Sequence, residues 1–101
     1  MQDSINKYLS HIEQNRNFSA QTLRAYQNDL QQYLSFLITE GCRDLGNVTR
    51  VFLRRFLAFL KKQDYSKTTI ARKLVSIRSL YKFLCREGIL KFNPLENIRA
   101  P

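Results

Sequence analysis

The residues of this sequence that could act chemically on a partner are cations and hydroxyls, and they gather in its second half. Between Lys61 and Lys91 the sequence has nine basic residues and two acidic ones. Within this stretch, the run Ser66-Lys67-Thr68-Thr69 precedes a segment with helical spacing. The first turn of a helix offers unpaired N–H groups and the positive end of the helix dipole, and both attract phosphate. The pattern indicates a site for a polyanion.

One side of the predicted helix continues this site. It carries small hydroxyl residues with long cations among them, which would let a duplex approach while the cations reach it. Its members are Thr69, Arg72, Ser76 and Ser79, with Lys73 close by. Arg78 lies nearer the core boundary, where it would brace the fold as readily as bind a phosphate. The plain alternative is a solvated basic face.

The charge of the 101-residue chain gives the same indication. Seventeen Lys and Arg against eight Asp and Glu give a net charge of +9. Residues 1–49 sum to −1 and residues 50–101 to +10. Such an asymmetric charge favours nucleic acid as the partner, with an anionic membrane surface as the lesser candidate. A basic protein without such a partner is the remaining interpretation.

A second polar stripe lies in the first half of the chain. At helical spacing it contains Gln21, Arg24, Asn28, Gln31, Gln32 and Ser35. Amide and guanidinium groups can bond base edges or phosphates, although a solvated face explains the same pattern. Asp29 would repel phosphate, so a hydrogen bond or an ion pair within the fold suits it better.

Patterns typical of enzymes and metal sites are weak. His11 is the only histidine and has no second ligand at metal-binding spacing, so no metal or other cofactor is expected. The sequence has neither a Gly-rich phosphate loop nor a nucleophile elbow. Cys42 and Cys85 are expected to stay reduced, because no secretion signal opens the chain. These features indicate a binding module.

Four amphipathic segments must position these residues. Their apolar spacing predicts helices at about 4–14, 19–39, 49–63 and 67–87. The expected caps are Asp3, Ser19, Thr49 and Ser66 at the starts, and Gly41 and Gly88 at two ends. Residues 94–98 are expected to add a helical turn, and residues 99–101 to begin a linker. The expected fold is one all-α domain over residues 1–98, a four-helix bundle without an apolar run of the ~20 residues that a membrane span needs.

The motifs of this sequence resemble the core-binding domain of tyrosine recombinases, a group that includes phage integrases and bacterial Xer recombinases. Its second helix is similar to Ser19-x-x-Thr22-x-x-x-Tyr26-x-x-Asp29-Leu30 followed by Phe36-Leu37. Its fourth helix is similar to Ser66-x-x-Thr69-x-x-Arg72-x-Leu74-x-Ser76-x-Arg78-x-x-Tyr81-x-Phe83-Leu84. Asn93-Pro94 with Ile98 and Pro101 resembles the exit toward the catalytic domain.

This resemblance implies a SAM-like orthogonal bundle that forms half of a clamp around double-stranded DNA. The second and fourth helices would meet the major groove. The implied DNA contacts are Gln21, Thr22, Arg24, Tyr26 and Asn28 on one helix, and Lys67, Thr68, Thr69, Arg72, Lys73, Ser76 and Arg78 on the other. The first helix, around residues 5–12, would contact other recombinase protomers in a synaptic assembly.

The resemblance also assigns strand cleavage to a different domain. In the family, the nucleophilic tyrosine and its Arg, Lys and His partners belong to a C-terminal catalytic domain, so this chain is expected to bind DNA without cleaving it. The implied location is the cytoplasm, at the nucleoid. Two other classes stay open: a basic helical module that binds an acidic protein, and a dimeric helix-turn-helix regulator. The eight or so residues between helices count against the regulator.

Overall fold

A computed structural model describes residues 1–96 of the chain, and these form an all-α fold. The helices are α1 (Gln2–Glu13), α2 (Ala20–Thr39), α3 (Arg50–Lys62) and α4 (Lys67–Arg86), with a short 3₁₀-helix, η1 (Leu45–Asn47), before α3. No strand occurs within this described range. The prediction of an all-α bundle of four helices is therefore confirmed. The connection between α2 and α3 contains η1, and the Asp44 side chain at its start accepts a hydrogen bond from the N–H of Gly46.

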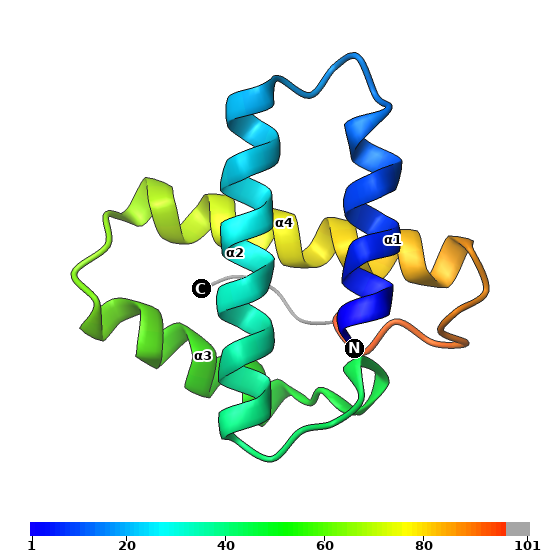
Figure 1. Cartoon of the computed structure of the whole chain (residues 1–101). Coiled ribbons are helices and arrows are strands. Elements are labelled where there is room, and N and C mark those ends of the chain that lie inside the picture. The colour runs from blue at the N-terminus through cyan, green and yellow to red at the C-terminus, as the bar shows by residue number, and fades with distance from the viewer. Residues whose placement is uncertain (97–101) are drawn as a thin grey trace.

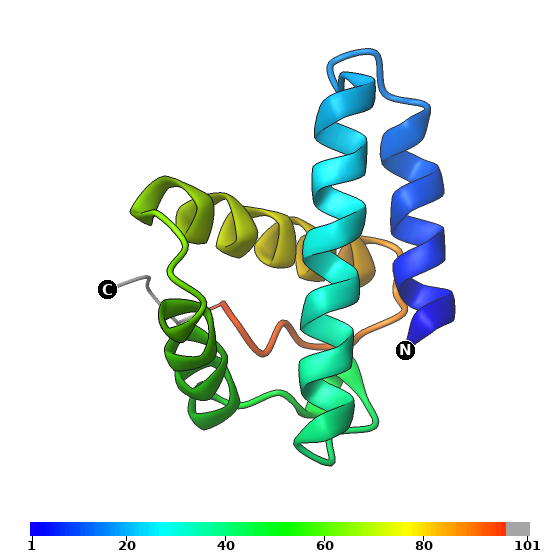
Figure 2. The same ribbon diagram turned by 60° about the vertical axis from the view of Figure 1, so that its left-hand side comes forward.

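The helices cross rather than align. α1 and α2 lie side by side as an antiparallel pair, and α4 runs across both of them (Figure 1). The turned view in Figure 2 shows the same crossing, with α3 on the side of α2 away from α1. α2 packs against each of the other three helices, and its main contact is with α4. The α2–α4 crossing is therefore the centre of the fold.

Local signals at the helix starts explain most of the boundaries. The side chains of Ser19, Thr49 and Ser66 each accept the backbone N–H three residues later, as an N-cap does. The prediction that Asp3 caps the first helix is wrong. That helix begins at Gln2, so Asp3 lies in its first turn, where an acid still complements the helix dipole.

Two helix ends depend on glycine. Gly41 and Gly88 follow α2 and α4 with φ of 81° and 73°, the left-handed conformation that favours a residue without a Cβ. Beyond α4, the N–H of Glu96 donates to the carbonyl of Asn93 over 3.2 Å and closes a turn. Residues 97–98 of the expected helical turn, and the expected linker at 99–101, lie outside the described residues.

The core is built on aromatic residues that join three helices. Tyr33 of α2 packs edge-on against Phe56 of α3, with 5.3 Å between ring centroids. Its hydroxyl lies 2.9 Å from that of Tyr81 of α4, which donates to the carbonyl of Leu45 over 2.8 Å. Both hydroxyls are therefore satisfied although both side chains are buried. This chain of hydrogen bonds fixes α4 against α2 and η1.

The two cysteines are unpaired. Cys42 is buried and Cys85 half-buried, and neither forms a disulfide. In the part of the chain that the structure describes, no helix has the length and the apolar character that crossing a bilayer requires.

Candidate nucleic-acid interface

The start of α4 carries exposed cationic and hydroxyl groups. Ser66 accepts the N–H of Thr69 over 3.1 Å and donates its own hydroxyl hydrogen to Thr69 Oγ1, also over 3.1 Å. Lys67 and Thr68 are exposed beside this cap. The cap holds the first turn of α4 in place, so a cation and a hydroxyl stand at the positive end of the helix dipole, where an anion is favoured.

A buried carboxylate lies at the crossing of α2 and α4. Asp29 of α2 has a fully buried side chain and accepts two hydrogen bonds from Arg72 of α4, from Nε over 3.1 Å and from Nη2 over 2.8 Å. Lys73 Nζ lies 2.9 Å from Asp29 Oδ1. The Ser76 hydroxyl donates to the backbone carbonyl of Lys73 over 2.8 Å, and its oxygen lies 3.4 Å from Asp29 Oδ2. The hydrogen bonds to Asp29 raise the pKa of Arg72. We call these four residues the Asp29 cluster.

Two of the residues expected to contact DNA belong to the interior of this cluster. Lys73 is 6% exposed and Ser76 is 0% exposed, so both side chains are buried in this structure. That these two residues contact DNA stays a prediction. The physical reason for the burial of Lys73 is Asp29, because a buried carboxylate is costly unless a cation compensates it. Arg72 differs, since 43% of its side chain is exposed while it bonds the same carboxylate.

Tyr65 covers the cluster, a role that sequence reasoning missed. Its ring centroid lies 4.8 Å from Lys73 Nζ, and its hydroxyl accepts a hydrogen bond from Gln32 Nε2 over 3.1 Å. The ring therefore lies against the ammonium from the loop between α3 and α4, while Gln32 ties it to α2. An aromatic residue in a break between two basic helices is the signal that could have drawn attention to it.

The expected contacts on α2 divide into exposed and supporting residues. Gln21, Arg24 and Asn28 are exposed. Thr22 is half-buried, and its hydroxyl accepts a hydrogen bond from the Ser19 hydroxyl over 2.9 Å. Tyr26 is half-buried and packs edge-on against Phe18. Of the five expected contacts on α2, three polar side chains are therefore exposed, and two residues support the helix start.

Along α4, an exposed face continues past Arg72. Val75 is 53% exposed, one helical turn from Arg72, and Ala71 is exposed beside it. Lys82 and Arg86 extend this face toward the end of the helix, and Arg78 is half-buried. Ser79 belongs elsewhere, because its hydroxyl bonds the Tyr8 hydroxyl of α1 over 2.6 Å. The face therefore combines cations with small uncharged side chains.

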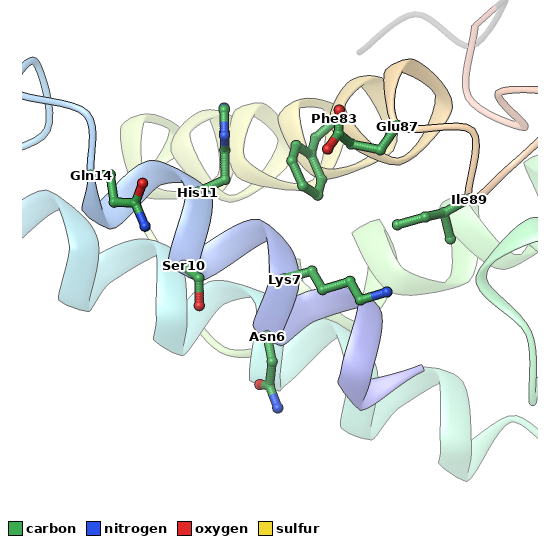
Figure 3. A pocket seen from close by; sticks show the side chains of 8 residues that line it. All are labelled: Asn6, Lys7, Ser10, His11, Gln14, Phe83, Glu87 and Ile89. Carbon is green, nitrogen blue, oxygen red and sulfur yellow. The ribbon is translucent and has the colours of Figure 1, made fainter.

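A separate hollow lies between α1 and the end of α4, away from the Asp29 cluster (Figure 3). The rings of His11 and Phe83 lie at its wall, with centroids 4.9 Å apart and planes tilted by 34°. Lys7 and Glu87 bring opposite charges to its lining. The side chains that α1 turns outward are mixed polar groups. Among the described residues, no group of three or more His, Cys, Asp or Glu could hold a metal ion.

Comparison with known proteins shows similarity to one family and to several bacterial proteins. Residues 5–88 match the family described as phage integrase, N-terminal SAM-like domain. Over all 101 residues the chain is 33% identical to the tyrosine recombinase XerC of Herpetosiphon aurantiacus and covers 33% of that protein. It is 35% identical to XerC of Oceanobacillus iheyensis over 96% of the chain and 32% of that protein.

A third relative, XerC of Listeria innocua, is 39% identical over 88 residues, which are 87% of the chain and 29% of that protein. No solved structure gives a significant match to the chain. The chain thus spans about a third of the length of the curated relatives it matches.

Proposed function

Because this chain belongs to the family of phage-integrase N-terminal SAM-like domains and is similar over its whole length to tyrosine recombinases, we propose that it binds double-stranded DNA through α2 and α4. In this proposal it forms half of a clamp around a recombination site. The other half would be the catalytic domain of the same protein.

The observation that carries this proposal is the exposed polar surface on both sides of the α2–α4 crossing. Lys67, Thr68 and Arg72 are exposed on α4, and Gln21, Arg24 and Asn28 on α2. The ion pair between Asp29 and Arg72 joins the two helices, which fixes the position of one set relative to the other. The half-buried Thr22, Tyr26, Thr69 and Arg78 stand as candidates for further contacts.

The chemistry of this surface suits DNA better than an acidic protein. The exposed lysines of α4, Lys67 at its start and Lys82 farther along it, supply phosphate contacts, which position a duplex but carry no sequence information. Amide and guanidinium groups on the neighbouring helix can bond base edges in a major groove. An acidic protein would need the cations but would leave the amide groups without a specific role.

We also extend the proposal to the whole protein. Other recombinase protomers would contact the outward side chains of α1, and catalysis would reside outside this chain. The setting would be the cytoplasm, where the nucleoid lies. The expected linker at residues 99–101 would lead to the catalytic domain.

The decisive experiment is fluorescence-anisotropy binding of the chain to a labelled ~30-base-pair duplex across a series of salt concentrations, with polyglutamate as competitor. Release of counterions predicts that log K falls linearly with log salt. Arg24→Gln and Lys67→Gln should each weaken binding and reduce the magnitude of that slope by about one. The matched control is Arg43→Gln, which removes an exposed cation in the loop after α2, where Arg43 lines a hollow with Met1 and Leu90.

Two outcomes would contradict the proposal. If polyglutamate competes as well as DNA at equal charge, the surface binds any polyanion and suits an acidic protein. If Arg43→Gln weakens binding as much as the other two substitutions, total charge rather than the α2–α4 surface determines affinity.

A further inference from the structure

We infer that Asp29 is a positioning residue that presents the free edge of the Arg72 guanidinium to paired acceptors on DNA, the O6 and N7 of a guanine. This inference rests on the proposed function, because it assigns a role within the same surface. Asp29 itself would touch no DNA, since its side chain is fully buried.

The geometry of the pair leaves one edge of the guanidinium available. Arginine carries five N–H donors in one rigid plane. Asp29 accepts hydrogen bonds from one edge of the guanidinium, from Nε over 3.1 Å and from Nη2 over 2.8 Å. The far end of the guanidinium carries a second pair of parallel donors, one N–H of Nη1 and the remaining N–H of Nη2. Such a pair of donors matches two acceptors side by side.

The burial of the cluster makes this orientation rigid. Lys73 holds the same carboxylate from a position that is only 6% exposed, and the ring of Tyr65 lies over Lys73. The carboxylate therefore cannot turn to follow Arg72, and Arg72 must adopt the orientation that Asp29 sets. A side chain ordered before binding loses less conformational entropy when the complex forms.

The neighbours of Arg72 favour a base edge over a phosphate. Ala71 and Val75 are exposed beside it on the same side of α4 and are small and uncharged. Such residues allow close approach to the floor of the major groove, where apolar side chains meet thymine methyl groups. Phosphates also offer paired acceptors, so the experiment must separate the two sources.

The test begins with a duplex that the chain itself selects from a randomised pool. That duplex is then synthesised with 7-deazaguanine at one guanine at a time, which replaces N7 by C–H and leaves the phosphates unchanged. For the unaltered chain, one such replacement should lower affinity at least ~5-fold, within the range for losing part of a bidentate base contact. The other replacements should have little effect.

The role of Asp29 is tested with the double variant Asp29→Asn, Lys73→Met. It removes one negative and one positive charge together, so the net charge stays at +9. The slope of log K against log salt should stay the same, whereas the dependence on the sensitive guanine should fall below about 2-fold. Lys73→Met alone is the matched control, because it keeps the Asp29–Arg72 pair and should keep the guanine dependence.

A second measurement needs no variant, so it can be made even if the double variant fails to fold. In the free protein, the Nε–H of Arg72 should exchange with solvent more slowly than that of the exposed Arg24, as followed by ¹⁵N NMR of the arginine side chains. Equal exchange rates would overturn the positioning role.

Each failure has its own meaning. If the folded double variant keeps the full guanine dependence, Asp29 does not position Arg72. If the chain binds DNA but no guanine is sensitive, Arg72 meets phosphate and the inference is wrong while the proposed function stands. If the unaltered chain does not bind DNA at all, the proposed function itself fails.

Discussion

Asp29 shows how one buried residue can govern both stability and the shape of a binding surface. Its carboxylate is surrounded by a guanidinium, an ammonium and a hydroxyl at 2.8–3.4 Å. Arg72 and Lys73 are adjacent in sequence, yet one side chain is 43% exposed and the other 7%. The two cations therefore have different energetic roles, which substitution can separate.

We predict that Asp29→Ala lowers the free energy of unfolding by about 3–5 kcal/mol, because it leaves the ammonium of Lys73 buried without a partner. Arg72→Ala should cost about 1 kcal/mol or less, since the guanidinium is partly solvated and Lys73 still compensates Asp29. Urea denaturation followed by circular dichroism measures both. Equal losses for the two variants would show that the buried pair is not the dominant interaction.

The buried tyrosines predict a specific response to alkaline pH. Desolvation by burial raises the pKa of Tyr8, Tyr33 and Tyr81 above 10.0. Above that pH the unfolded chain loses phenolic protons that the folded chain keeps. The tyrosines therefore contribute their full stabilisation below about pH 10, and the free energy of unfolding falls as pH rises, by at most about 1.4 kcal/mol per pH unit for each tyrosine.

Urea midpoints from about pH 9 to about pH 11 test this slope. The Tyr81→Phe variant should show a shallower fall than the unaltered chain, because one of the three phenols is absent. Stability that stays constant over this range would contradict the assignment of buried, neutral phenols.

At the scale of the element, the start of α4 links capping to binding. Ser66 and Thr49 are both N-caps whose side chains accept a backbone N–H. Aspartate is a comparable N-cap, so Ser66→Asp and Thr49→Asp should each leave stability within about 0.5 kcal/mol of the unaltered chain. Both substitutions add the same negative charge, but only Ser66 lies on the proposed DNA surface.

We therefore predict that Ser66→Asp weakens DNA binding several-fold more than Thr49→Asp at the same ionic strength. The physical reason is repulsion between the new carboxylate and a phosphate at the α4 N-terminus. Anisotropy titrations of the two variants, with thermal melts as the folding control, measure the difference. Equal effects would place the start of α4 away from the bound duplex.

At the scale of the whole molecule, binding and cleavage should be separate. The hydroxyls of Tyr8, Tyr33 and Tyr81 are held in hydrogen bonds within the bundle, and their pKa values are raised. A phenol that is buried and difficult to ionise is a poor nucleophile. These three tyrosines therefore have structural roles.

We predict that the chain binds supercoiled plasmid without nicking it, at concentrations that retard the plasmid in a gel. Denaturing electrophoresis after protease treatment reveals nicked DNA and any protein joined to it. Nicking that disappears in a single Tyr→Phe variant would contradict this prediction and place a nucleophile in this chain.

The sequence by itself determined the helices, most of their caps and the basic character of the second half. These features are local, because helix boundaries follow from apolar spacing and from residues such as Ser19, Ser66 and Gly41 within one turn of each end. The α4 face could be placed only roughly. Charged and hydroxyl side chains are exposed on average. By residue type alone, exposure is therefore expected for Arg72, Lys73 and Ser76 alike.

Only the tertiary structure decided which of these residues are exposed. Asp29 lies more than forty residues before Arg72 and Lys73, and no local pattern shows that its carboxylate draws Lys73 inward. Tyr65 gains its covering role in the same way, through contacts with Gln32 and Lys73. A buried charge must be compensated by whichever residues the fold brings near it, so the polar surface that stays exposed depends on the crossing of α2 and α4.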